Sequence, residues 1–143
     1  MKTEPLEAAY RATTYRVFLP AGAVDLHIGE ANAALARWLV EESASSWAIL
    51  TAHNPASEPL TAAENAELQS ELECAVLELG FMTFAGENVA DEGSWPNEES
   101  CFIPDIDMKN SMALARRFGQ NALVFGEGDG FPRLIWVKEE KNQ

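Results

Sequence analysis

The sequence predicts an α+β protein, a mixed β-sheet with about three helices packed on it in the order ββαβαββαββ. Short apolar or alternating segments typical of strands are separated by segments with helical spacing, without strict strand–helix alternation. The 143 residues are 47% hydrophobic and 23% charged, as in ordinary globular proteins. A chain of this length fits one core, so we expect a single domain over residues 1–143, with residues 1–12 and 138–143 at its periphery.

The first predicted elements are a β-hairpin and a helix. Apolar side chains alternate on both sides of a break at residues 20–22, and the alternating positions are Tyr15, Val17, Leu19, Val24, Leu26 and Ile28. Residues 31–42 then carry apolar side chains at helical spacing, which predicts an amphipathic helix with Trp38 in the core.

An interior strand and a long helix follow. The run WAILTA, residues 47–52, is nearly continuous in apolar residues, which favours a strand covered on both faces. It ends at residues 53–55, because proline lacks an N–H and biases the preceding residue away from helix. Thr61 and Glu64 form a capping-box pattern that predicts a helix ending near Leu79.

The second half of the sequence is predicted to form four strands and one helix. Residues 86–100 contain Gly, Pro, Asn and five carboxylates, and this composition predicts a long loop of the kind that often carries function. Asp107 is the expected N-cap of a helix that ends near Phe118. The expected strands cover residues 81–85, 100–103, 122–125 and 134–137.

Charge and composition exclude several classes of function. The net charge of −13 would repel a phosphate backbone, so nucleic acid is not an expected partner, whereas a basic protein is. No apolar run is long enough to span a membrane and no export signal precedes the domain, so we expect a soluble, cytoplasmic protein with reduced Cys74 and Cys101. Metal-ligand spacing is also absent, and the sequence leaves any cofactor unknown.

The segments TAHNP (51–55) and FGQNA (118–122) place uncharged polar groups beside buried strands. Asn54 follows the interior strand, and helical spacing turns Asn65 toward the core near the start of the next helix. These amides either line a pocket or fix the path of the loop, and both interpretations stay open. The same two alternatives apply to Gln120 and Asn121, which follow a glycine-ended helix.

Four neighbouring residues complete the candidate ligand-binding set. His53 is a possible general base, although an isolated histidine after a strand is more often simply packed. Trp95 would act as a lid or, as we favour, anchor its loop to the core. Glu99 and Ser100 belong to an acidic stretch whose carboxylates are usually only solvated, and no metal role is assigned to them.

The assembled segments resemble an uncharacterised bacterial family, domain of unknown function 3293. The resemblance depends on residues 48–57, Glu64-Asn65, Leu79-Gly80, the stretch from Trp95 to Ser100, and residues 117–122. It implies family membership and carries no activity, substrate or catalytic residue.

Two functional hypotheses follow. The first is a small-molecule-binding domain with an amide-lined polar pocket, and the sequence leaves open whether this domain is an enzyme. The alternative is an acidic protein-interaction or regulatory module without a catalytic site, in which the amides are structural.

Overall fold

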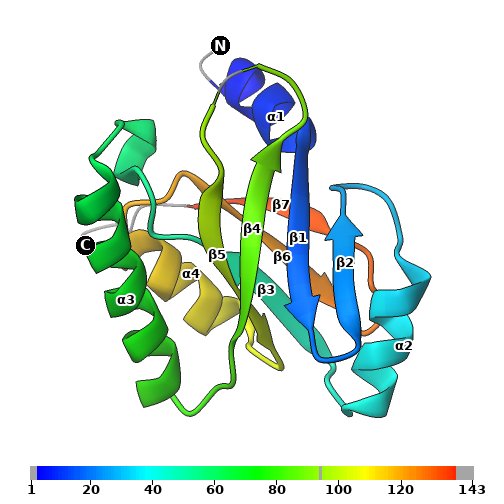
Figure 1. Cartoon of the computed structure of the whole chain (residues 1–143). Coiled ribbons are helices and arrows are strands. Elements are labelled where there is room, and N and C mark those ends of the chain that lie inside the picture. Colours follow the sequence, from blue (N-terminus) through cyan, green and yellow to red (C-terminus); the bar gives the residue numbers. More distant parts are fainter. Residues whose placement is uncertain (1–2, 94, 138–143) are drawn as a thin grey trace, which may run out of the picture.

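The structure is a computed structural model that describes residues 3–93 and 95–137 (Figure 1). Seven strands form one sheet in the order β2-β1-β4-β5-β3-β6-β7. The strands are β1 (Thr13–Leu19), β2 (Gly22–Leu26), β3 (Ser46–Leu50), β4 (Phe84–Ala90), β5 (Glu98–Pro104), β6 (Ala122–Glu127) and β7 (Arg133–Trp136). The α-helices are α1 (Thr3–Arg11), α2 (Ala33–Glu41), α3 (Ala62–Glu78) and α4 (Met108–Arg117), and a short 3₁₀ turn, η1, covers Pro55–Ser57.

The expectation of a mixed sheet is wrong, because every neighbouring pair of strands is antiparallel. Each of α2, α3 and α4 does connect two strands that run in the same direction. In the sheet, however, at least one antiparallel strand lies between the two connected strands, as β5 lies between β3 and β4. The predicted order of elements is otherwise close to the observed one.

The structure has one helix more than the sequence predicted. α1 occupies residues that we had placed at the periphery of the domain. Leu6 and Tyr10 lie one turn apart on its inner face, and the two-residue apolar pattern is too short to stand out in the sequence. The other terminal segment assigned to the periphery, residues 138–143, lies outside the described residues.

The sheet is strongly curved, so that β6 and β7 pass behind β1 and β2 in Figure 1. α3 and α4 pack on the convex face, where Leu72 and Leu114 meet buried residues of β3, β5 and β6. α2 packs against the concave face through Leu35 and Leu39. β3 lies between β5 and β6 and is covered on both faces, as the apolar run predicted. None of the described helices is long and apolar enough to cross a membrane.

The predicted loop over residues 86–100 is wrong at both ends. β4 continues to Ala90 and β5 begins at Glu98, which leaves a connection of residues 91–97. Gly86 belongs to a strand rather than to a turn. A side chain there would approach Ser100 Oγ to 2.6 Å and the Arg16 carbonyl oxygen to 2.7 Å, so glycine is required by close packing within the sheet.

The start of α3 is confirmed by its capping box. The Thr61 hydroxyl accepts a hydrogen bond from the Glu64 N–H at 3.1 Å, and the Glu64 carboxylate accepts one from the Thr61 N–H at 3.0 Å. Hydrogen bonds from the backbone and hydroxyl of Thr61 lower the pKa of Glu64. This cap fixes where the helix begins and therefore where Asn65 points.

Candidate functional site

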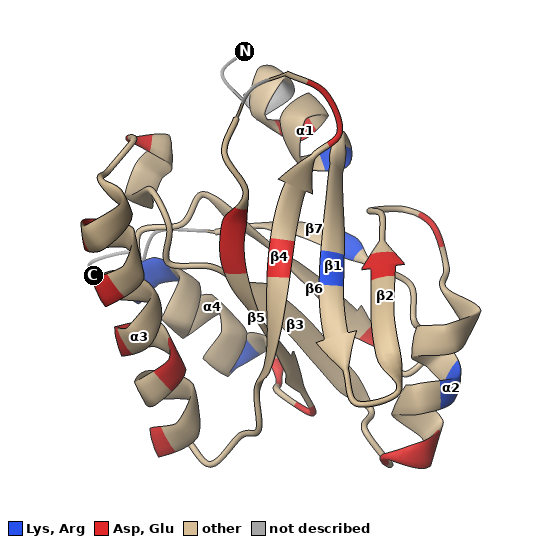
Figure 2. Ribbon diagram, viewed as in Figure 1, with Lys and Arg blue, Asp and Glu red and all other residues tan. Residues whose placement is uncertain are grey.

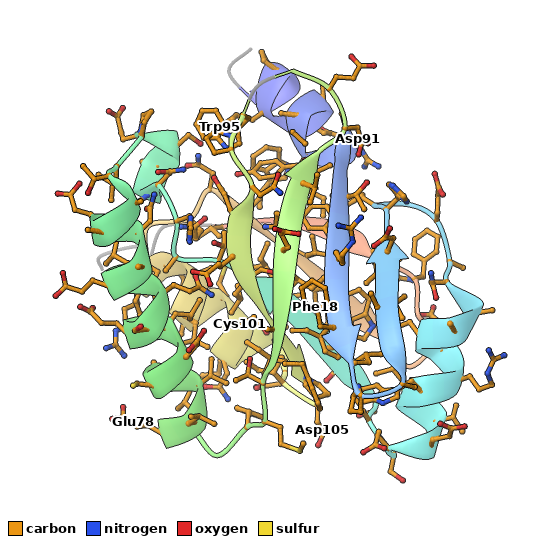
Figure 3. All side chains as sticks on the ribbon, in the orientation of Figure 1. Phe18, Glu78, Asp91, Trp95, Cys101 and Asp105 are labelled. Atoms are coloured by element: carbon orange, nitrogen blue, oxygen red, sulfur yellow. The ribbon has the colours of Figure 1, made fainter. Side chains whose placement is uncertain are left out.

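A cavity of about 400 Å³ lies on the concave side of the sheet, at the end of the barrel-like curve that α1 covers. Its apolar wall comes from the floor of the sheet and from the inner face of α1, and the residues are Leu6, Ala9, Ile49, Ala122, Val124 and Leu134. Its polar side is formed at the strand ends and in the last turn of α1, and the residues are Tyr10, Tyr15, Thr51, His53, Asn54, Asn88, Glu98 and Gln120. Figure 3 shows Trp95 at this end of the molecule, close to α1, and Trp95 also lines the cavity.

The antiparallel order explains why these residues meet. Antiparallel neighbours place the end of one strand beside the start of the next. Accordingly, the end of β3 with Thr51 lies beside the start of β5 with Glu98, and the Thr51 hydroxyl donates to the Glu99 carbonyl oxygen at 2.7 Å. The end of β4 and the start of β1 complete the same edge through the register pair of Tyr15 with Asn88.

Asn65 points inward, as the helical spacing predicted, and is only 7% exposed. Its Oδ1 accepts from the Asn54 N–H at 2.8 Å and its Nδ2 donates to Asn54 Oδ1 at 2.9 Å. Asn54 Oδ1 also accepts from the Leu60 N–H at 2.9 Å. Asn65 does not line the cavity. Of the two roles that the sequence leaves open, lining a pocket or fixing the path of the loop, its contacts correspond to the second.

The loop after β3 adopts an unusual backbone. Asn54, Ala56 and Ser57 all have positive φ, at 48°, 55° and 62°, which is a costly region for residues other than glycine. The Ala56 N–H donates to the Gly119 carbonyl oxygen at 2.6 Å, which ties the loop to the end of α4. A side chain at Gly119 would lie 2.9 Å from Pro55 Cβ, so the two chain segments are in direct contact.

The two amides after α4 have different positions. Gln120 lines the cavity, and its Nε2 donates to the carbonyl oxygens of His53 at 3.1 Å and Phe118 at 3.2 Å. Asn121 does not line the cavity, and its Nδ2 donates to Ser57 Oγ at 3.0 Å. Both amides therefore hold the loop after β3, and only Gln120 also faces the cavity.

His53 lines the cavity with a side chain that is 12% exposed. Its Nε2 lies 3.8 Å from Glu99 Oε1 and has no hydrogen-bond partner among the described residues. Glu99 itself is 69% exposed and does not line the cavity. Ser100 is buried against Gly86, outside the lining, with an Oγ that is unpaired within the described part of the chain.

The carboxylate at the cavity is Glu98, which was not among the candidate residues. Glu98 Oε2 accepts from Trp95 Nε1 and from Asn54 Nδ2, each at 2.9 Å. Side chains of a strand alternate between its faces, so Glu98 faces the cavity and Glu99 does not. The alternation that separates Glu98 from Glu99 is present in the sequence. The predicted strand, however, starts near Ser100 and leaves Glu98 in a loop. Trp95, although 47% exposed, is anchored through its bond to Glu98.

Two tyrosines at the cavity were also missed. The Tyr15 hydroxyl donates to the Tyr10 carbonyl oxygen at 3.1 Å. Burial raises the pKa of Tyr10; hydrogen bonding with Asn121 opposes this, and the negative charge of Glu98 adds to it. Burial likewise raises the pKa of Tyr15, with smaller contributions from Tyr10, Glu98 and Asp91. Both hydroxyls are therefore neutral near pH 7 and able to donate hydrogen bonds.

The formally charged side chains that line the cavity are Glu98 and Glu92. No Lys or Arg of the described chain lines it. The described residues contain no group of three or more His, Cys, Asp or Glu side chains placed to hold a metal ion. The arrangement is therefore suited to binding an organic molecule by hydrogen bonds, a carboxylate and apolar contact.

Comparisons with known proteins give one match. No curated protein and no solved structure matches the chain. The family model described as "Protein of unknown function (DUF3293)" matches residues 50–123, which are 74 of the 143 residues. The match covers the loop after β3, α3, β4, β5 and α4, and it extends to Leu123 at the cavity floor. The chain therefore belongs to the DUF3293 family, whose function is unknown.

Proposed function

We propose that this protein binds a small organic molecule in the cavity beneath α1. The supporting observation is the cavity itself, whose volume of about 400 Å³ falls within the usual range for small-molecule sites. It combines an apolar floor with polar groups gathered on one side, the arrangement by which such sites hold and orient a ligand. Asn88 Oδ1 is buried there without a hydrogen-bond partner in the described structure, and a ligand would supply one.

The proposal includes a place for chemistry. His53 is the side chain through which a reaction in the cavity would transfer a proton, because it lines the cavity and histidine is the residue most often used for general acid–base catalysis. Turnover of a bound molecule would make the protein an enzyme, whereas binding alone would make it a sensor or carrier.

The proposal is tested by placing a large side chain on α1 so that it fills the cavity. Ala9 lines the cavity and is exposed, so tryptophan at this position would occupy the binding space without disturbing the core. Ala8 is the matched control, because it is the neighbouring exposed alanine and does not line the cavity. We expect a thermal-shift screen of metabolites to give ligands that stabilise the wild type and Ala8→Trp, by ~2.7 kcal/mol at 100 times the dissociation constant, and fail to stabilise Ala9→Trp. Ligands that stabilise all three proteins equally would place the site elsewhere.

The acidic interaction module is the second candidate, supported by α3. The solvent-exposed side of this helix carries five glutamates and no basic residue, namely Glu64, Glu67, Glu71, Glu73 and Glu78 (Figure 2). A basic protein captured from native lysate should bind less as salt rises, because exposed charges are screened. Glu67→Gln/Glu71→Gln should weaken that capture, and salt-insensitive capture would contradict the interaction model.

A further inference from the structure

We propose that the ligand of the cavity carries a protonated amine or amidine, held by the carboxylate of Glu98. This inference rests on the proposed function and adds the chemical class of the ligand. It combines three features of the cavity. One carboxylate is fixed and keeps one oxygen without a partner, a second unpaired acceptor lies beside it, and no Lys or Arg of the described residues lines the cavity.

The orientation of Glu98 is fixed by neutral donors. Trp95 Nε1 and Asn54 Nδ2 both donate to Oε2, each at 2.9 Å. Oε1 of the same carboxylate has no hydrogen-bond partner among the residues that the structure describes. An ionised carboxylate accepts several hydrogen bonds, and bonds from a charged donor are the strongest of these. Glu98 is therefore oriented in advance and keeps acceptor capacity for a ligand.

A second acceptor lies beside this carboxylate. Asn88 and Glu98 are directly paired in the register of β4 and β5, and both line the cavity. Paired residues on neighbouring strands project to the same face, with their Cβ atoms roughly 5 Å apart. Asn88 Oδ1 is buried and lacks a hydrogen-bond partner within the described residues. An ammonium group has three donors and would satisfy both acceptors at once.

Two arginines on the elements around the cavity form ion pairs outside it. Arg16, on β1, pairs with Asp25 at 2.8 Å and lies 3.6 Å from Glu87. Arg11, on α1, pairs with Glu7 at 3.0 Å. Neither arginine lines the cavity, so the described part of the chain gives Glu98 no Lys or Arg as a counter-ion there.

The other walls also favour a cation. The aromatic side chains of Tyr10, Tyr15 and Trp95 line the cavity near Glu98, and aromatic faces attract ammonium and amidinium groups. Glu92 adds a second negative charge to the lining, and the whole chain has a net charge of −13. A carboxylate or phosphate ligand would meet these charges without a compensating Lys or Arg among the described lining residues. The apolar floor then accommodates the uncharged body of the amine.

Matched probes separate charge from shape. Tryptamine, tryptophol and indole-3-acetate share an indole body and differ in a cationic, neutral or anionic end, and benzamidine tests an amidine. Titration is followed by calorimetry and by the indole N–H signals in NMR spectra. The Trp95 N–H donates to Glu98 and should shift on amine binding, whereas the Trp47 N–H donates to the Glu127 carbonyl oxygen at 3.0 Å and should not.

Tryptamine is expected to bind about 10- to 100-fold more tightly than tryptophol, the advantage of a hydrogen bond to a charged group, and indole-3-acetate should bind most weakly. Glu98→Gln keeps an acceptor for Trp95 and Asn54 but removes the charge, so it should reduce tryptamine binding to the level of tryptophol. Glu99→Gln is the matched control, because Glu99 is mostly exposed and outside the cavity, and it should leave the preference unchanged.

Tryptophol or indole-3-acetate binding as tightly as tryptamine would overturn the amine inference. If Ala9→Trp abolished the binding of tryptophol or indole-3-acetate, the proposal that the cavity binds a small molecule would still stand. Failure of both tryptamine and benzamidine to bind at millimolar concentration would also overturn the amine inference. The proposed function would then depend on the metabolite screen alone. An unchanged preference in Glu98→Gln would show that Glu98 is not the counter-ion.

Discussion

Replacing Gly126 with alanine is expected to lower the free energy of unfolding by about 3 kcal/mol, from overpacking of a dense core together with a lost hydrogen bond. A Cβ at this position would overlap the indole ring of Trp47. Trp47 is fully buried and packs against Phe102 with ring centroids 5.7 Å apart. Its Nε1 also donates to the Glu127 carbonyl oxygen, so displacing the ring would break this hydrogen bond.

Gly128 is the matched control for this substitution. A Cβ there would meet only the Ala44 carbonyl oxygen at 3.7 Å, which is an ordinary contact. We therefore expect Gly128→Ala to change stability by less than about 0.5 kcal/mol, as surface substitutions usually do. Urea unfolding followed by near-ultraviolet circular dichroism measures both variants. Equal stability of the two variants would show that the indole is able to move aside.

Replacing Asn65 with alanine is expected to cost about 2–3 kcal/mol of stability and to disorganise the polar side of the cavity. The substitution leaves the Asn54 N–H without its acceptor and removes the donor to Asn54 Oδ1. Leaving a buried backbone donor unsatisfied costs about 1–3 kcal/mol by itself. Asn54 would then also lose the restraint that directs its Nδ2 to Glu98.

The control for Asn65 is another asparagine in the first turn of a helix. Asn110 Nδ2 donates to Asp107 Oδ1 at 2.7 Å at the protein surface, so Asn110→Ala should change stability by less than about 0.5 kcal/mol. Thermal and urea unfolding compare the two alanine variants. In Asn65→Ala, the NMR signal of the Trp95 indole N–H should also move toward its solvent-exposed position. An unchanged signal, or equal stability of the two variants, would show that the loop is held without Asn65.

The elements with strong local signals were predictable. The capping box and apolar spacing placed α3, and the continuous apolar run placed β3 in the interior. The order of strands in the sheet was not predictable, because chain connectivity does not determine which strand lies between two that a helix connects. α1 was missed because its contact side, with Leu6 and Tyr10, is too small to give a recognisable pattern.

The candidate site was only partly predictable for a similar reason. His53, Asn54 and Gln120 were chosen for their places at element ends and Trp95 for its place in the predicted loop, and all four line the cavity. Asn65 and Asn121 lie just behind the lining, where they hold the loop after β3. Tyr10, Tyr15, Asn88 and Glu98 come from strands and a helix that converge only in the folded chain, and period-two alternation alone could have distinguished Glu98 from Glu99.

The loop after β3 connects the two sides of the sheet. Asn54 is bound to α3 through Asn65 and to the cavity through Glu98, while Ala56 is bound to the end of α4 through Gly119. These hydrogen bonds form one continuous connection between the cavity wall and the helical layer on the opposite face. The energetic effects of substitutions in these segments will not be additive, since they share one loop whose backbone is held in a costly conformation.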